Sequence, residues 1–331
     1  MVKYSIILRA YNAGNHVAKS IESIISQSYS EWELIIVNDG STDNTGSICE
    51  EYAAKDDRIK VFHQNNKGCL LATQTGIENS TGEYICLIDS DDWYSERYLE
   101  CVDTIACNHD VDMIVTNYYT VEPMQKKSKF SLTKEDFIAD NIKAIEIFLK
   151  TTNYALWNKV VKKEKINYTI DEKHFFASYG KQANFGDDLY QLMPVLCGCE
   201  NIYFTSEYLY NYVIDEKSVS HQRVRDQWND MLKRNRLMGF TYKAIRDREC
   251  MNASIKSLIE VNTVKLLLPG MVDVLKYKKI DRNALREFKS DEFYRKVIMR
   301  MKYSKMNRKF GKKRAVIFWL FNLMVLCSNH N

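Results

Sequence analysis

Three things are scarce in this chain, and each scarcity narrows what the protein can be. Only 3 of its 331 residues are prolines, so rigid Pro-rich linkers between modules are not expected. Of its 9 cysteines only Cys197 and Cys199 are closely spaced, and no pair of Cys-x-x-Cys knuckles exists, so a zinc site is not expected. No apolar run after Met1 is long enough for a secretory signal, and we therefore expect the reducing cytosol.

The composition is that of an ordinary globular protein. Hydrophobic residues make up 45% of the chain, which excludes a disordered chain and an integral membrane protein. The length allows one large domain or two moderate ones. The net charge is only +4 and no nucleic-acid-binding module can be recognised, so no nucleic-acid partner is expected.

The first part of the chain alternates short apolar runs with stretches of helical spacing. Strands are predicted at 5–8, 32–37, 59–63 and 84–88, and helices at 17–28, after residue 43 and at 70–79. Repeated βαβ units of this kind imply a mostly parallel, Rossmann-like sheet with helices on both faces. Ligands of such sheets bind beyond the carboxyl ends of the strands, which is where Asp39 and Asp89 fall.

The pattern changes after a strand predicted at 113–116. The polar, lysine-rich residues 117–136 predict a loop or insertion near the site. Helices are predicted at 142–149 and 189–196, and short strands at 202–204 and 208–212. From about residue 222 the spacing is helical throughout, which predicts a separate C-terminal region.

A cluster of acids follows the fourth predicted strand, in the sequence Asp89-Ser90-Asp91-Asp92. Three carboxylates within four residues repel one another and add nothing to a core. A bound divalent cation would neutralise them, because Mg²⁺ and Mn²⁺ commonly bridge protein carboxylates to substrate phosphates. The alternative is a solvated acidic turn that caps the next helix, a role also open to Asp92 alone.

These motifs resemble those of the family 2 glycosyltransferases, of the type that builds bacterial cell-surface polysaccharides. Residues 4–100 carry the resemblance, through Tyr11-Asn12, the segment 36–43, the segment 81–84 and the acidic cluster. It continues more thinly to about residue 221, through Leu156-Trp157-Asn158-Lys159, Phe185-Gly186-Asp187-Asp188 and the tyrosine-rich stretch from residue 208. The resemblance implies an α/β catalytic domain of the GT-A fold over 1–221, with 1–116 holding the donor and 117–221 the acceptor. A helical region over 222–331 would follow it.

The resemblance also implies an activity. The enzyme would be inverting, would use a divalent cation (Mn²⁺ or Mg²⁺) as cofactor, and would move a sugar from a nucleotide donor, with UDP the default nucleotide. The acceptor would be a glycan or a lipid-linked saccharide. Asp91 would bind the metal directly and Asp89 would lie near the ribose, with His221 as a further candidate ligand. The residues expected to contact the donor are Tyr11, Asn12, Asp39, Gly40, Ser41, Gly68, Asp89 and Ser90.

Two of the implied site residues have alternative roles. Asp39 would accept a hydrogen bond from the nucleobase, or would instead form an Asx-turn with Gly40 and Ser41. Trp157 is expected in the core or under the acceptor sugar.

The catalytic base is predicted to be Asp188, with Asp187 beside it. A carboxylate near its ordinary pKa of about 3.9 is ionised at neutral pH. A neighbouring buried acid would raise that pKa and improve the proton acceptor. The alternative is that the two acids complement the dipole of the helix that follows, and the two roles are compatible.

Two departures from the family pattern concern donor binding. Arg9 stands where the family usually has proline, and Thr73-Gln74 stands where it usually has Arg-Asn after an alanine. A guanidinium is therefore missing from a region rich in phosphate and carboxylate. This keeps open a non-catalytic module that binds a sugar nucleotide or a partner. A nucleotidyltransferase is a weaker alternative, because residues 9–14 lack the Gly-rich basic loop that such an enzyme would need.

The last segment of the chain places a basic run before a short apolar run. Seven lysines and arginines lie between residues 302 and 314, and residues 315–327 are mostly apolar. The apolar run spans roughly 20 Å as a helix, which is shorter than the ~30 Å hydrocarbon core of a membrane. We expect it to dock on the anionic inner face of the cell membrane, as a peripheral cytoplasmic protein. Burial in the core or in a homodimer interface is the alternative.

Overall fold

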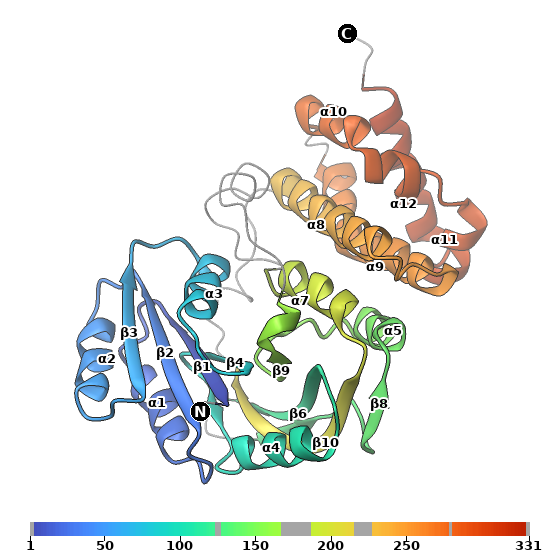
Figure 1. Ribbon diagram of the computed structural model, residues 1–331. Coiled ribbons are helices and arrows are strands. Elements are labelled where there is room, and N and C mark those ends of the chain that lie inside the picture. Colours follow the sequence, from blue (N-terminus) through green and yellow to red (C-terminus); the bar gives the residue numbers. More distant parts are fainter. Residues whose placement is uncertain (1–2, 123–126, 167–186, 215–226, 278–279, 329–331) are drawn as a thin grey trace. The chain divides into compact units, whose positions relative to one another are not determined.

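The computed structural model describes the chain except residues 1–2, 123–126, 167–186, 215–226, 278–279 and 329–331. It divides into two compact units, one of residues 1–144 and 153–222, the other of residues 145–152 and 223–331. The first is an α/β unit and the second is helical (Figure 1). The boundary predicted at 221/222 lies outside the described residues, and the helical unit also includes 145–152, which belong to α5 (Asn141–Thr151).

The α/β unit is built on one mixed sheet. Within the described residues the strand order is β3-β2-β1-β4-β9-β6-β10-β5, with β7 paired to β6 and β8 to β10. The bounds are β1 Tyr4–Ala10, β2 Trp32–Asp39, β3 Ile59–Gln64, β4 Tyr84–Asp89, β5 Trp93–Tyr94, β6 Met113–Val121, β7 Lys127–Phe130, β8 Phe137–Ala139, β9 Lys159–Lys162 and β10 Ile202–Val213. The first four strands pair in parallel as predicted. The second half combines the parallel pair β6–β10 with antiparallel neighbours.

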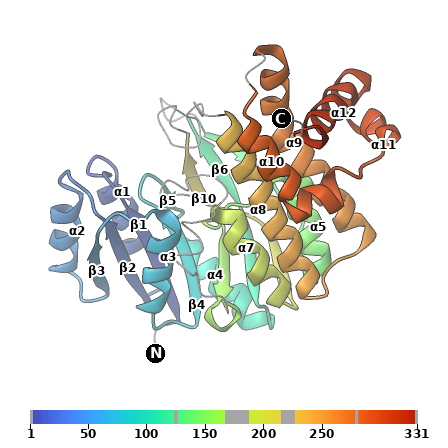
Figure 2. The same ribbon diagram turned by 90° about the horizontal axis from the view of Figure 1, so that it is seen from above.

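Helices cover both faces of the first four strands, as predicted (Figure 1, Figure 2). On one face, alternate strand residues such as Ile6 and Leu34 pack in a core with α1 (Val17–Ile25), α2 (Thr45–Ala53) and α4 (Tyr98–Asn108). On the other face, α3 (Cys69–Glu78) lies so close to β1 that a side chain at Gly76 would collide with Ile7. Strands buried on both faces explain the continuous apolar runs in the sequence.

Two predicted features of the acceptor half differ in the structure. Residues 117–136, predicted as a loop, include the end of β6 and all of β7, which pair as a hairpin. The exposed edge strand β7 has the sequence Lys-Ser-Lys-Phe and shows no apolar alternation, so its pattern could not be told from a loop. The two short strands predicted at 202–204 and 208–212 form the single strand β10, whose register against β6 shifts between Phe204 and Tyr210.

A buried carboxylate fixes the turn before β4. Glu33, 3% exposed, accepts hydrogen bonds from Ser5 Oγ (2.7 Å), Lys60 Nζ (2.9 Å) and Thr81 Oγ1 (2.7 Å). Burial acts to raise the pKa of Glu33, but these hydrogen bonds outweigh it and lower the pKa to about 2. Part of the 81–84 motif is therefore structural, since it sets where β4 begins and so where Asp89 stands.

The second unit consists of packed helices. They are α8 (Gln227–Asp247), α9 (Ala253–Tyr277), α10 (Arg282–Ser290), a π-helical turn (Tyr294–Ile298), α11 (Tyr303–Phe310) and α12 (Lys312–Leu326). Buried side chains such as Phe288 and Phe321, with ring centroids 5.7 Å apart, form its core. Of the helices in the described part of the chain, none has the length and apolarity needed to cross a membrane.

Candidate active site

The loops after β1 and β2 meet beyond the carboxyl end of the sheet. The Asn12 N–H donates to Ser41 Oγ (3.0 Å), and the Thr42 N–H donates to Asn12 Oδ1 (2.8 Å). Gly40 has a φ of +75°, and a Cβ there would lie 2.6 Å from the backbone nitrogen of Asn66, so this turn requires glycine. The side chain of Tyr11 is 52% exposed at the same edge. The structure therefore brings these four predicted donor-binding residues together.

Asp39 holds the loop that leads into α3. Its buried carboxylate accepts hydrogen bonds from Gln64 Nε2 (2.7 Å), the Lys67 N–H (2.8 Å) and the Gly68 N–H (2.8 Å). The turn at Gly40 and Ser41 is bonded instead by Asn38, whose Oδ1 accepts from the Ser41 N–H (3.1 Å). Asp39 thus organises the predicted donor loop, and its contact with a nucleobase stays a prediction.

The acidic cluster separates into two parts. Asp92 is 1% exposed and accepts from the Tyr210 hydroxyl (2.7 Å) and the Val213 N–H (2.7 Å), which fastens the cluster to β10. Burial, with Asp89 and Asp91 nearby, raises the pKa of Asp92 well above its ordinary value. The prediction that Asp92 caps a helix is wrong, because β5 follows it. Asp89 and Asp91 are only half-buried, with Ser90 between them.

Asp89 and Asp91 form a donor set that suits a cation completed by its substrate. Mg²⁺ and similar ions are commonly held by one or two carboxylates, with substrate phosphates and water as the other ligands. Within the described residues no group of three or more His, Cys, Asp or Glu side chains is arranged to hold a metal by itself. Asp89 and Asp91 fit a site in which one or two carboxylates hold the ion and substrate phosphates and water complete its ligands. His221, the further candidate ligand, lies outside the described residues.

Arg9 contacts Thr73, one of the positions at which the sequence departs from the family pattern. Its guanidinium, at the end of β1, bonds the carboxylate of Asp89 and donates to Thr73 Oγ1 (3.3 Å) on α3. Arg9 is 8% exposed, and its Nε is buried with no hydrogen-bond partner among the described atoms. Gln74 bonds Glu78 on its own helix (2.8 Å) and does not substitute for the arginine. The two departures from the family pattern are therefore in contact, and a guanidinium from β1 lies against α3.

Asp188 lies beside this arginine at the start of α7 (Asp187–Gly198). Burial raises its pKa to about 6, with Arg9 acting to lower it, Asp89 to raise it further and Lys159 to lower it. A carboxylate with this pKa suits proton transfer near neutral pH. Of Asp187, the structure describes the backbone in α7 but not the side chain.

Lys159 completes a row of alternating charges with Asp188, Arg9 and Asp89. It lies on β9, is 1% exposed, and donates to Asn158 Oδ1 (2.9 Å). Burial lowers its pKa to about 7 in spite of the neighbouring Asp188. In the sequence, Lys159 stands out only as part of the Leu156–Lys159 motif, and Arg9 only as a departure from the family pattern. The available signal was a basic residue within an apolar strand, which is costly unless it is paired.

Trp157 occupies one of its two expected places, the core. It is 6% exposed, with its ring stacked on Tyr210 (4.4 Å between centroids) and Tyr212 (5.1 Å) and edge-on to Tyr118 (4.6 Å). Its packing supports β10, which also holds Asp92. A contact between Trp157 and an acceptor sugar stays a prediction.

A mixed α/β sheet with helices on both faces of its parallel half, followed by a helical region, is a GT-A-like fold. Residues 5–180 match the family model described as Glycosyl transferase family 2, and the chain belongs to that family. The glycosyltransferase GlyA of Streptococcus pneumoniae serotype 4 is 31% identical over 230 residues, which cover 66% of this chain and 31% of GlyA. GlyG of the same organism is 34% identical over 181 residues, covering 52% of this chain and 59% of GlyG. The match thus spans less than two thirds of either relative.

Solved structures show the same fold. S. aureus TarS 1–349 in complex with UDP-GlcNAc superposes with a TM-score of 0.69 at 16% identity, covering 97% of this chain and 91% of the TarS chain. The likeness confirms the GT-A-like fold and extends through the helical region. At 16% identity the similarity to TarS is evidence for the fold only.

Proposed function

We propose that this chain is an inverting glycosyltransferase that moves a sugar from a UDP-sugar to a hydroxyl of a glycan or lipid-linked saccharide, in surface polysaccharide biosynthesis. The observation that carries the proposal is Asp188, whose pKa burial raises to about 6 and which lies beside the Arg9–Asp89 pair. Family membership supports the reaction class. UDP-GlcNAc bound to TarS, a protein of the same fold, supports UDP as the nucleotide.

In this mechanism the chain's own residues bind the donor, orient it and move one proton. The loops at Asn12 and Asp39 would hold the nucleoside, and Arg9 would face the diphosphate. Asp91 and Asp89 would hold the cation, which when bound offsets the charge that grows on the leaving diphosphate. Asp188 would accept the proton of the acceptor hydroxyl while that oxygen attacks the anomeric carbon on the face opposite the diphosphate, which inverts the configuration.

One contact argues against the non-catalytic alternative. That alternative rested on the absence of an arginine at Thr73, and the Arg9 guanidinium contacts that residue from β1. Nothing in the described site favours a nucleotidyltransferase.

Metal binding at Asp91 is tested by the effect of Mn²⁺ on UDP affinity. Calorimetry on the wild-type chain is expected to show UDP binding at least tenfold tighter with Mn²⁺ than with EDTA, because Asp91 would hold the ion and the ion would supply positive charge to the diphosphate. Asp91→Asn should remove this enhancement and leave metal-free binding within about twofold. Asp103→Asn, an aspartate on α4, is the matched control and should keep the enhancement. Equal UDP affinity with and without Mn²⁺ in the wild type would exclude the metal.

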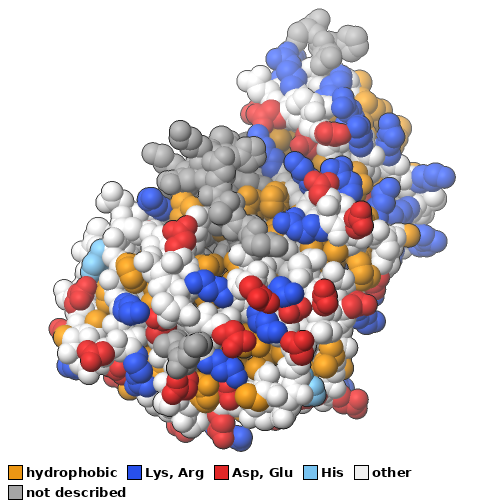
Figure 3. All heavy atoms as spheres, in the orientation of Figure 1, with side chains coloured by type: hydrophobic (Ala, Val, Ile, Leu, Met, Phe, Trp, Pro, Cys, Tyr) orange, Lys and Arg blue, Asp and Glu red, His pale blue; other side chains and the backbone are white. Residues whose placement is uncertain are grey.

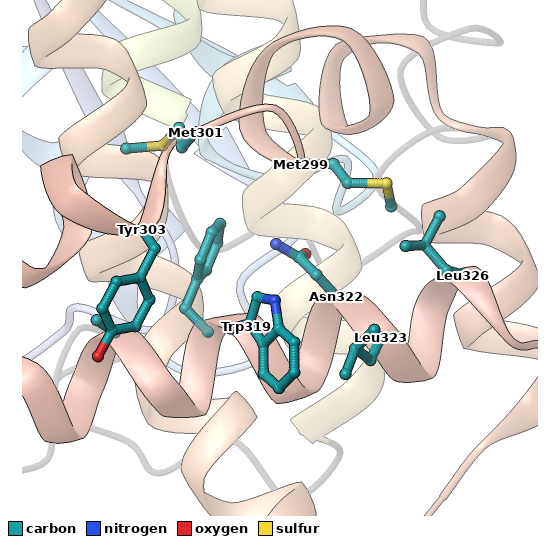
Figure 4. A pocket seen from close by; sticks show the side chains of 9 residues that line it. Met299, Met301, Tyr303, Trp319, Asn322, Leu323 and Leu326 are labelled. Atoms are coloured by element: carbon teal, nitrogen blue, oxygen red, sulfur yellow. The ribbon is translucent and has the colours of Figure 1, made fainter.

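The membrane surface is proposed as a partner of α12, which is apolar on two sides. Its buried residues are Ala315, Phe318, Phe321, Asn322 and Val325, and its exposed apolar residues are Val316, Trp319, Leu320, Leu323 and Leu326. Trp319 is 53% exposed and, with Tyr303 and Leu323, borders a hollow of about 150 Å³ (Figure 4). Lysines and arginines gather on the region of α11 and α12 (Figure 3). An aromatic, apolar face flanked by cations complements an anionic bilayer surface.

Vesicle sedimentation tests this partner. The wild-type chain is expected to sediment with vesicles containing phosphatidylglycerol and to stay in solution with pure phosphatidylcholine, since each basic residue near the surface adds about 1 kcal/mol. The Trp319→Glu/Leu323→Glu double variant should lose binding, whereas Ile138→Glu, which alters an exposed residue of β8, should keep it. If the double variant instead splits a homodimer without changing sedimentation, the face is a protein interface.

A further inference from the structure

An aromatic groove beside β5 carries two lysines that form no ion pair with any acid in the described part of the chain. It is lined from α1, β5, β6, β7 and β10, all within the α/β unit, and encloses about 660 Å³. That volume falls in the range of ligand pockets, about 300–1,000 Å³. The proposed donor site, metal site and catalytic base all lie outside this groove.

The lysines converge on one indole ring. Lys19 Nζ of α1 lies 3.0 Å from the centroid of the Trp93 ring, and Lys127 Nζ of β7 lies 5.7 Å from it and 5.5 Å from the Tyr119 ring. Lys127 also donates to Asn211 Oδ1 (2.9 Å). Within the described chain no carboxylate forms an ion pair with Lys19 or Lys127. Two like charges share one aromatic surface, which an added anion would stabilise.

The two acids that also line the groove do not neutralise Lys19 or Lys127. Glu22 accepts a hydrogen bond from the Tyr52 hydroxyl (2.6 Å), and Glu96 lies on the turn after β5. Neither is paired with a lysine of the groove. Burial and the neighbouring Lys127 both lower the pKa of Lys19, as expected for two ammonium groups held close together.

The groove also offers what a sugar needs. Tyr119 and Tyr208, with centroids 5.1 Å apart, extend the aromatic surface from Trp93, and Lys129 lies 4.9 Å from the Tyr208 ring. Aromatic rings stack on the apolar faces of sugars, and the Tyr119 hydroxyl can bond a sugar hydroxyl. Trp93 follows Asp91 by two residues, so their Cα atoms are at most about 7 Å apart. The groove therefore begins two residues along the chain from the acidic cluster.

We propose that this groove is a subsite for an anionic acceptor, a saccharide with a carboxylate or phosphate placed between Lys19 and Lys127 and a sugar ring on Trp93. The inference rests on the proposed function for its acceptor role, but binding in the groove can be measured without turnover. The proposal selects an acidic glycan over a neutral one. A lipid headgroup alone would leave the aromatic surface unused.

The test compares matched saccharides by calorimetry, without nucleotide. The probes are hyaluronan tetrasaccharide, which carries carboxylates, neutral chitotetraose, and N-acetylglucosamine 6-phosphate against inorganic phosphate. The wild-type chain is expected to bind hyaluronan tetrasaccharide at least tenfold tighter than chitotetraose, and the sugar phosphate tighter than phosphate. The preference should weaken from 50 to 200 mM salt.

Variants separate charge from stacking. Lys19→Gln/Lys127→Gln should lower affinity for the charged tetrasaccharide about tenfold and leave chitotetraose unchanged. Trp93→Ala should weaken both saccharides. Lys55→Gln is the control, because Lys55 also faces an aromatic ring, that of Tyr52 (5.7 Å), away from the groove.

Equal affinity of the wild type for the two tetrasaccharides would overturn the proposal, as would a lysine double variant that behaves like Lys55→Gln. Tight binding of inorganic phosphate alone would refute the saccharide subsite. UDP binding, measured separately on each variant, reports on the donor site. If the wild-type chain does not bind UDP, the proposed function is contradicted. The affinities of the saccharides for the groove would still test the subsite.

Discussion

Asp188→Asn is expected to lower the rate of sugar transfer by about 10²–10⁴-fold, the usual contribution of a general base. The amide has nearly the same shape as the carboxylate but cannot accept the proton of the acceptor hydroxyl. Affinity for UDP should change by less than about threefold, because the base meets the acceptor and not the nucleotide. The measurements are transfer from a UDP-sugar under saturating donor and UDP calorimetry on the same preparations.

The matched control for this variant is Asp110→Asn, an exposed aspartate whose partner is Lys162 on the surface (2.8 Å). It should transfer sugar at the wild-type rate. An Asp188→Asn variant with full transfer activity would show that another group is the base. A variant that loses UDP binding and transfer together would instead point to a general disturbance of the site.

The raised pKa of Asp188 also leads us to expect that kcat/KM of the wild-type enzyme depends on pH. Its pKa of about 6 lies above the ordinary value because of burial, so the base is ionised at pH 7 and becomes protonated as the pH falls through 6. The charged groups that face it are Arg9 from β1, Asp89 from β4 and Lys159 from β9. We expect kcat/KM to fall about tenfold per pH unit below that midpoint. An acid limb near pH 4 would mean that the working carboxylate is not buried.

Much of the donor half could be predicted because its signals are local. Apolar runs of strand length, separated by helical spacing, predicted the parallel strands and the edge at which Asp39 and Asp89 emerge. The acids that precede the apolar pattern of α7 placed Asp188 at a helix start, which the structure confirms. Each inference needed only neighbours along the chain.

The contacts that define the candidate site are not local. Arg9 meets Thr73 across 64 residues, and Asp92 meets Tyr210 across 118. No periodicity encodes such pairs, because they depend on which strands become neighbours and on the register between them. The burial of Lys159 could not be predicted from the sequence for the same reason. The strand β9 acquires its neighbours β4 and β6 only in the folded sheet.

The pairing of Arg9 with Thr73 leads to the second large effect. Arg9→Met keeps the backbone N–H of β1 and most of the side-chain volume but removes the charge. It is expected to lower kcat/KM for the donor about 10²-fold, mostly through KM, because a hydrogen bond to a charged group contributes about 1.5–3 kcal/mol and the guanidinium has more than one. Methionine is preferred to the family's usual proline, which would also remove a ladder donor.

The rescue variant decides what Arg9 does. If the guanidinium acts on the donor phosphates, Arg9→Met/Thr73→Arg returns an arginine to the neighbourhood of Asp89 from α3 and should recover at least tenfold of the lost kcat/KM. Thr73→Arg alone should impair the enzyme, because two guanidinium groups would then compete for Asp89. The four proteins form a double-mutant cycle whose coupling measures the exchange directly. A double variant no better than Arg9→Met would mean that Arg9 serves only to orient Asp89, and the family arginine would then have no counterpart in this chain.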